Sequence, residues 1–187
     1  MTSRSEKKFY NFKEAIIKYK EIDRPEIALD ELVLLILGLL EDKPVNGKVV
    51  MQKEVFIFAN ELKENNIKII EPTFVSLHYG PFSQELAVLL ELLELAGYIR
   101  IWHRRRMKAT KYELTDKGKN IARKIIKELE NKYGKEFIEK LRTLRIGLDQ
   151  LGHDGILRYV YRKYPRFAEK SKIKDKYPYI DWGVSVA

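Results

Sequence analysis

Cysteine is absent from this sequence of 187 residues. The absence excludes disulfides, thiolate zinc sites and cysteine nucleophiles together. Long hydrophobic runs are missing too, since none approaches the roughly 20 residues that a transmembrane helix requires. The first residues are polar and charged, with no apolar segment behind them, so no signal peptide is predicted. We therefore expect a soluble, cytoplasmic protein that does not span a membrane.

Patterns typical of catalytic sites are equally scarce. The three histidines, His78, His103 and His153, are far apart and lack the spacing of metal ligands. The sequence has no glycine-rich phosphate loop, no carboxylate-rich metal motif and no serine in a nucleophile elbow. We expect neither an enzyme nor a metal or cofactor site.

Hydrophobic residues and positive charge are well represented. The hydrophobic fraction is 45%, which is enough for a folded core, and the net charge is +9. A positive surface concentrates polyanions such as DNA or RNA, although a lysine-rich solvated surface would give the same balance. Charged residues at 34%, few methionines and no cysteine also suit a thermophile.

The stretch from Thr73 to Gly118 organises the chain. An apolar helix is predicted over residues 81–96, and Gly97 ends it because glycine adopts a left-handed cap conformation without a steric penalty. Residues 98–103 and 110–114 have the aromatic, β-branched or alternating pattern of two strands, joined by a basic turn. Thr115 is a suitable N-cap for another helix, to about residue 132. This order predicts a winged helix-turn-helix domain.

Further helices are predicted on both sides of this stretch, over residues 25–41, 48–64, 137–151 and 154–164, and residues 42–47 are predicted to form a turn between the first two. The predicted fold class is mainly α with a small β-hairpin. We expect an N-terminal arm with a short helix over residues 1–24, a winged-helix domain over 25–132, and a helical C-terminal extension over 133–187. The last residues, from Arg166 onward, show no clear period and are predicted to be irregular.

Two motifs resemble those of the PadR-type winged-helix regulators, and the second of them is shared by MarR-like groups. The first is a long helix that ends in Gly97-Tyr98-Ile99. The second follows the return strand and reads Lys111-Tyr112-Glu113-Leu114-Thr115-Asp116-Lys117-Gly118. This resemblance covers roughly residues 32–129 and implies a transcriptional regulator that binds double-stranded DNA.

A second resemblance is to the SocA/Panacea antitoxin-type domain, over roughly residues 49–99. It rests on a Gln-Lys pair followed by apolar and aromatic residues, Gln52 to Ala59, and on the later segment Tyr79-Gly80-Pro81-Phe82-Ser83. Members of that group are associated with toxins or with delivery to a protease. The resemblance therefore implies a protein partner.

The candidate DNA contacts lie mainly in the basic hairpin, within twelve residues that contain no acid. A wing of this kind could contact phosphates or enter the minor groove, whereas the alternative is a solvated turn. The hairpin candidates are Arg100, Arg104, Arg105, Arg106, Lys108 and Lys111. The helix over 81–96 adds only Ser83 and Gln84, because Glu85, Glu91 and Glu94 would repel phosphates.

Two functions therefore remain open. The first is a DNA-binding winged-helix regulator, expected to be a homodimer whose chains pair through the helices after the wing, although packing within one chain would explain those helices as well. The second is a protein-interaction module of antitoxin or proteolytic-adaptor type on the same fold. RNA binding and a structural role are less favoured alternatives.

Overall fold

The computed structural model describes residues 26–104 and 109–172. The predicted N-terminal arm over 1–24 and most of the irregular tail lie outside the described residues. The described part is mainly helical and carries a small antiparallel sheet. This agrees with the predicted fold class at that level.

The first helix, α2 (Leu29–Gly38), is buried on nearly all sides and packs against α5 (Asp116–Tyr133). Their close approach depends on Gly38, where a Cβ atom would lie 2.5 Å from the Cβ of Ala122. The next helix, α3 (Lys48–Glu64), has the predicted bounds. It is amphipathic in sequence, yet Gln52, Lys53 and Glu54 are all buried.

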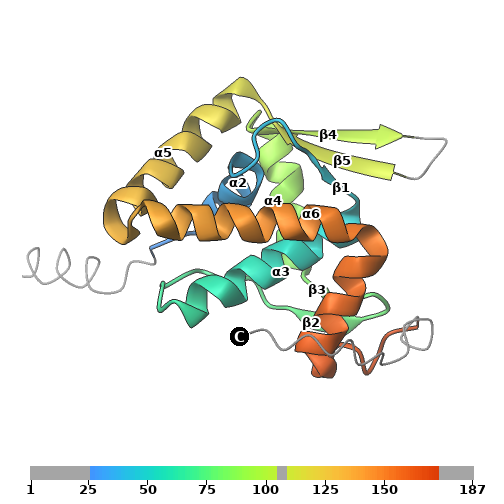
Figure 1. The fold of residues 1–187 in the computed structure, drawn as a ribbon. Coiled ribbons are helices and arrows are strands. Elements are labelled where there is room, and N and C mark those ends of the chain that lie inside the picture. The colour runs from blue at the N-terminus through green and yellow to red at the C-terminus, as the bar shows by residue number, and fades with distance from the viewer. Residues whose placement is uncertain (1–25, 105–108, 173–187) are drawn as a thin grey trace, which may run out of the picture.

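The three-stranded sheet has the order β1–β5–β4 (Figure 1). The pair β4 (Ile99–Arg104) and β5 (Ala109–Leu114) is the predicted hairpin, and it extends away from the helices. The third strand, β1 (Val45–Asn46), was predicted to be part of a turn. It is short, but its pairing with Tyr112 and Lys111 adds it to the sheet.

The helix predicted over 81–96 begins later than expected. Its first residues form β3 (Gly80–Phe82), which pairs with β2 (Val75–Leu77), and α4 then spans Gln84–Leu95. The helix starts after Ser83 because the Ser83 hydroxyl caps it by accepting from the Leu86 N–H, and Pro81 lies in the strand before this cap. The stop at Gly97 is confirmed, with φ of 75°.

The C-terminal part of the described chain consists of α6 (Lys135–Lys163), which is kinked at Gly152, and the 3-10 helix η1 (Pro165–Phe167). It was predicted as two helices, and the break between them is real, since Gly152 has φ 60° and ψ −167° inside α6. Figure 1 shows α6 crossing the front of the molecule over α3. The apolar faces of α5 and α6 pack within this one chain.

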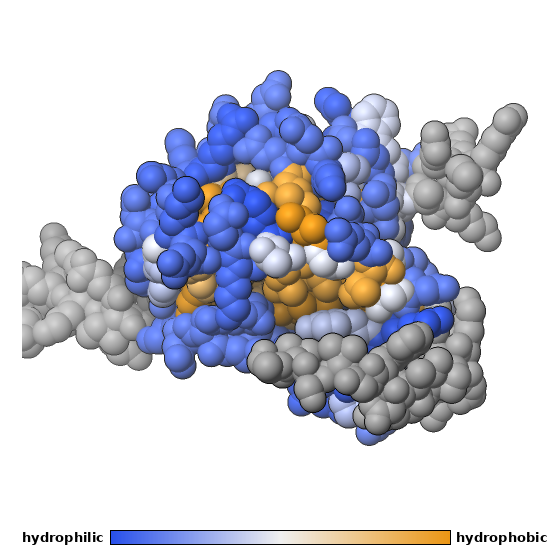
Figure 2. Space-filling view, viewed as in Figure 1, coloured by the Kyte–Doolittle hydropathy of each residue, from blue (hydrophilic) through white to orange (hydrophobic). Residues whose placement is uncertain are grey.

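A buried ion pair joins α6 to α3. Arg145 Nε lies 3.2 Å from Glu54 Oε2, both side chains are inaccessible to solvent, and Asp149 lies 3.7 Å from the guanidinium. Burial raises the pKa of Glu54 to about 7, although the charge of Arg145 opposes this shift. The face seen in Figure 2 is mostly hydrophilic, with hydrophobic surface gathered across its middle, where α6 runs.

Candidate nucleic-acid interface

The β4–β5 hairpin presents two different faces because successive side chains of a strand point to opposite sides. Ile99 pairs with Leu114 and Ile101 with Tyr112 on the side that packs against the core. Arg100 pairs with Glu113 and Trp102 with Lys111 on the other side. The register therefore brings the predicted contacts Arg100 and Lys111 onto one exposed face.

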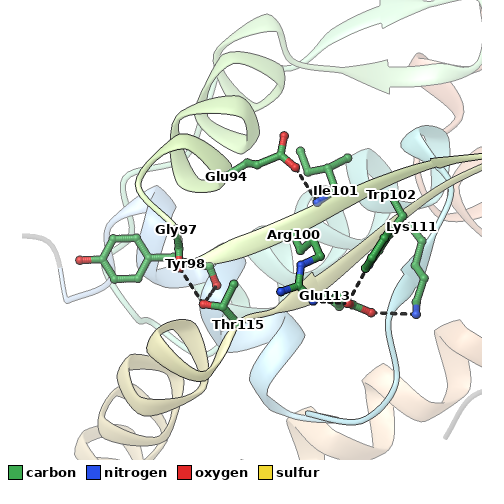
Figure 3. A network of polar contacts seen from close by, with 9 residues as sticks. All are labelled: Glu94, Gly97, Tyr98, Arg100, Ile101, Trp102, Lys111, Glu113 and Thr115. Atoms are coloured by element: carbon green, nitrogen blue, oxygen red, sulfur yellow. Dashed lines mark hydrogen bonds and ion pairs between the residues drawn. The ribbon is translucent and has the colours of Figure 1, made fainter.

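Glu113 connects the side chains of this face (Figure 3). Its carboxylate lies 2.7 Å from Lys111 Nζ and 3.6 Å from Arg100 Nη1, and it accepts a hydrogen bond of 2.7 Å from the indole N–H of Trp102. The guanidinium of Arg100 lies 5.3 Å from the centre of the Trp102 ring. Two cations and one indole thus share a single carboxylate, which we call the Glu113 cluster.

The Glu113 cluster keeps its acid ionised. Hydrogen bonds from Lys111 and Trp102, followed by the charges of Lys111 and Arg100, lower the pKa of Glu113. A phosphate that approaches Arg100 or Lys111 must therefore compete with this carboxylate. Residues 100–111 contain no acid in the sequence. In the structure, however, Glu113 lies beside both ends of this stretch, Arg100 and Lys111.

Of the remaining basic candidates, the structure describes the backbone of Arg104. Arg104 is the last residue of β4 and pairs with Ala109 through the backbone. Arg105, Arg106 and Lys108 lie outside the described residues.

Ser83 is not available for base contacts, contrary to the prediction. Its side chain is fully buried, and its hydroxyl accepts a hydrogen bond from the N–H of Leu86 as the N-cap of α4. Its backbone N–H donates to Gln52 Oε1 at 2.8 Å, and its carbonyl accepts from Gln52 Nε2 at 2.9 Å. Ser83 therefore fixes the start of α4. Gln84, the next residue, is exposed.

The accessible surface of α4 is acidic and apolar. Glu85, Glu91 and Glu94 are exposed, in agreement with the pattern read from the sequence. Between them lies a hydrophobic stripe at helical spacing, with Val88, Leu92 and Leu95 exposed by 46%, 53% and 85%. We call these three residues the α4 stripe. The buried positions of α4 are filled by Leu86, Leu90 and Leu93.

The Thr-x-Lys-Gly exit from the hairpin locks the end of α4 to the start of α5. Thr115 caps α5 by accepting from the Gly118 N–H, and its hydroxyl contacts the carbonyl oxygens of Gly97 and Tyr98 (Figure 3). Lys117 Nζ donates to the Ala96 carbonyl at 2.9 Å. A Cβ atom at Gly118 would lie 2.0 Å from the Tyr98 carbonyl oxygen, so only glycine fits. The motif is explained by packing.

The two segments that carry the second resemblance, Gln52 to Ala59 and Tyr79 to Ser83, contact each other in the structure. Besides the Gln52 contacts with Ser83, the ammonium of Lys53 donates to the Pro81 carbonyl at 2.7 Å. Gly80 packs against Tyr161 of α6, whose ring would lie 2.9 Å from an added Cβ. The Gln-Lys pair thus holds the β2–β3 hairpin and the start of α4 in place.

The basic face of α5 is largely engaged in surface ion pairs. Arg123 binds Glu41 through two hydrogen bonds of 2.8 and 2.7 Å, and Lys119 lies 3.5 Å from Asp42. Lys127 pairs with Glu130 at 3.2 Å. These contacts favour a solvated face over a DNA contact.

Within residues 26–104 and 109–172, no group of three or more potential ligands is placed to hold a metal ion. No helix in the same described ranges is long and apolar enough to cross a membrane. No protein-family model, curated protein or solved structure matches this chain.

Proposed function

We propose that this chain is a winged-helix protein that binds double-stranded DNA and regulates transcription. In this proposal the β4–β5 hairpin is the wing and makes the principal DNA contacts. The helix α4 occupies the place of a recognition helix without inserting along its length into the major groove.

The observation that carries the proposal is the topology. The elements α2, β1, α3, α4, β4 and β5 follow one another in the winged-helix order of helix, strand, helix, helix and two strands. The sheet order β1–β5–β4 places the first strand beside the last, as that fold requires. The β2–β3 hairpin is an insertion between α3 and α4.

The charge distribution supports contact through the wing. Arg100 and Lys111 are accessible on the exposed face of the hairpin, and the sequence between β4 and β5 adds Arg105, Arg106 and Lys108. Arginine is favoured in narrow minor grooves because the potential there is strongly negative. The carboxylates of α4 would instead face phosphates and raise the free energy of a groove-inserted complex.

Duplex binding across a range of salt concentrations tests this proposal. The variant Arg104→Ala/Arg105→Ala/Arg106→Ala is compared with wild type and with Lys124→Ala/Lys127→Ala/Lys135→Ala, which has the same net charge but changes exposed lysines of α5 and α6. Each lost phosphate contact reduces the slope of log K against log salt by about 0.9. The wing variant should lose most binding and the control little. Absent binding at low salt, or equal losses, would contradict the proposal.

The α4 stripe favours a second candidate, a protein-interaction module of antitoxin or adaptor type. Three large exposed apolar side chains at positions i, i+4 and i+7 form the kind of helix face that docks on a protein partner. Affinity isolation from the native host should recover a stoichiometric partner with wild type but not with Leu92→Glu/Leu95→Glu. Recovery of no partner, or equal recovery by both chains, would count against this candidate.

A further inference from the structure

A cavity of about 360 Å³ lies at the junction of α3, the β2–β3 hairpin, α4 and the β4–β5 hairpin. Its walls are mainly aliphatic and aromatic, and include Val49, Leu77, Phe82, Leu90 and Ile101. Small-molecule sites are typically concave, mostly apolar and provided with a few polar groups. DNA binding through the wing makes no use of this cavity.

Two buried polar side chains, Gln52 and Lys53, belong to its wall, and Lys53 is the charged one. The side chain is 2% exposed, and its ammonium donates one hydrogen bond, to the carbonyl of Pro81. An ammonium has three donors, and in the described part of the chain the hydrogen-bond partner of Nζ is the Pro81 carbonyl and not a carboxylate. Burial lowers the pKa of Lys53 to about 7. An anion in the cavity would compensate the cost of burying this cation.

The part of the wall that α4 contributes is acidic. Glu91 and Glu94 of α4 line the cavity and are exposed, so they lie toward its solvent side. Burial, followed by the charges of these two carboxylates, raises the pKa of Tyr112, another lining residue, to about 12. They disfavour a second negative charge on a ligand whose first charge has reached Lys53.

The volume limits the size of the apolar part. A cavity of about 150 Å³ holds a benzene molecule, so 360 Å³ accommodates roughly ten to fourteen non-hydrogen atoms. We propose that the cavity binds an aliphatic monocarboxylate of about eight carbons, with its carboxylate on the Lys53 ammonium and its chain along the apolar walls. This inference does not depend on DNA binding.

Isothermal titration of the full chain with octanoate, octanol and octylamine tests the proposal. The three probes share the same alkyl chain and differ in head group. Octanoate should bind at least ten times more tightly than octanol, and octylamine should bind most weakly. Equal affinities for octanoate and octanol would overturn the role of Lys53, and no binding of octanoate would overturn the site.

Two variants locate the binding. Lys53→Met keeps a similar volume and should remove the preference for octanoate over octanol, whereas Lys63→Met, on the same helix but outside the cavity wall, should keep it. Because Lys53→Met also loses the Pro81 hydrogen bond and could fail to fold, Ala87→Trp provides an independent test. Ala87 lines the cavity and is partly accessible, so tryptophan should fill the space and abolish binding of both probes. Unchanged octanoate binding by Ala87→Trp would place the ligand elsewhere and overturn the proposal.

Discussion

The β4–β5 hairpin and α4 are consecutive in the chain, joined through Gly97, yet their accessible surfaces differ in charge and polarity. The hairpin presents Arg100 and Lys111 around one carboxylate, whereas α4 presents three carboxylates and the α4 stripe. A helix in this position would be expected to read DNA, and its chemistry opposes that role. The side chains of an element therefore indicate its function better than its position in a fold does.

The anchoring of the two regions differs as well. The first residues of α4 are held in the core by Gln52, while Glu113 ties the hairpin together at the surface. Substitutions at the base of α4 should therefore change the stability of the protein. Substitutions in the hairpin should change binding.

The largest expected effect is on stability, from Gln52→Leu. The change leaves the buried N–H of Ser83 without a partner, whereas the Ser83 carbonyl loses the Gln52 amide but keeps the Ala87 N–H at 3.3 Å. An unpaired buried group costs about 1 to 3 kcal/mol, so the free energy of unfolding should fall by about 2 kcal/mol. Urea denaturation measures the loss. Gln84→Leu, at the exposed first residue of α4, is the control and should change stability by less than about 0.5 kcal/mol. Similar losses in both variants would refute the anchoring role.

A smaller effect, on affinity, is expected from Glu113→Gln. The change removes the carboxylate that competes with phosphate for Arg100 and Lys111, so duplex binding should tighten about three- to tenfold in about 0.1 M salt. Fluorescence anisotropy with a labelled duplex measures it. Glu91→Gln changes the charge equally on α4 and should alter binding by less than about twofold, because exposed charges farther than about 10 Å are screened. A stronger gain from Glu91→Gln would mean that α4 approaches DNA.

Leu92→Glu/Leu95→Glu should have little effect on folding. Both side chains are largely exposed, so the free energy of unfolding should change by less than about 0.5 kcal/mol for each. Duplex affinity should remain near that of wild type, since α4 already lacks favourable DNA contacts. Denaturation and anisotropy on the same samples give both values. A large loss of stability would show that the α4 stripe packs within the chain.

The smallest expected effect is the pH dependence of the Glu113 cluster. Its contacts lower the pKa of Glu113 from the usual 4.5, so their contribution to stability is present above that value and is lost as the pH falls through the lower folded-state pKa. Because the cluster is near the surface, this contribution is below about 1 kcal/mol. The difference in unfolding free energy between wild type and Glu113→Gln should shrink as the pH falls below about 4.5. If this difference in unfolding free energy instead grew as the pH fell, the contacts of Glu113 would not stabilise its ionised form.

Local patterns in the sequence were enough to predict several features. Gly97 as a helix stop, Thr115 as an N-cap and the bounds of α3 were correct, because each depends on residues close in the chain. The hairpin was correct for the same reason. The helix break near Gly152 was also visible in the hydrophobic pattern.

Features that depend on distant contacts were missed. The burial of Ser83 follows from Gln52, which is 31 residues away in the chain. The pairing of Val45 with Tyr112 made a strand from a predicted turn. The role of Glu113 depends on the strand register, which places it opposite Arg100. Pairing residues 99–104 with 109–114 in antiparallel register would have predicted this neighbour from the sequence.

If the protein binds DNA through the wing as proposed, the exposed face of α4 stays free of DNA. Titrating an unlabelled duplex into ¹⁵N-labelled protein and following the backbone amide signals tests this arrangement directly. Large shifts are expected between Arg100 and Lys111, and small shifts from Glu85 to Leu95. Large shifts along α4 with an unchanged hairpin would contradict it.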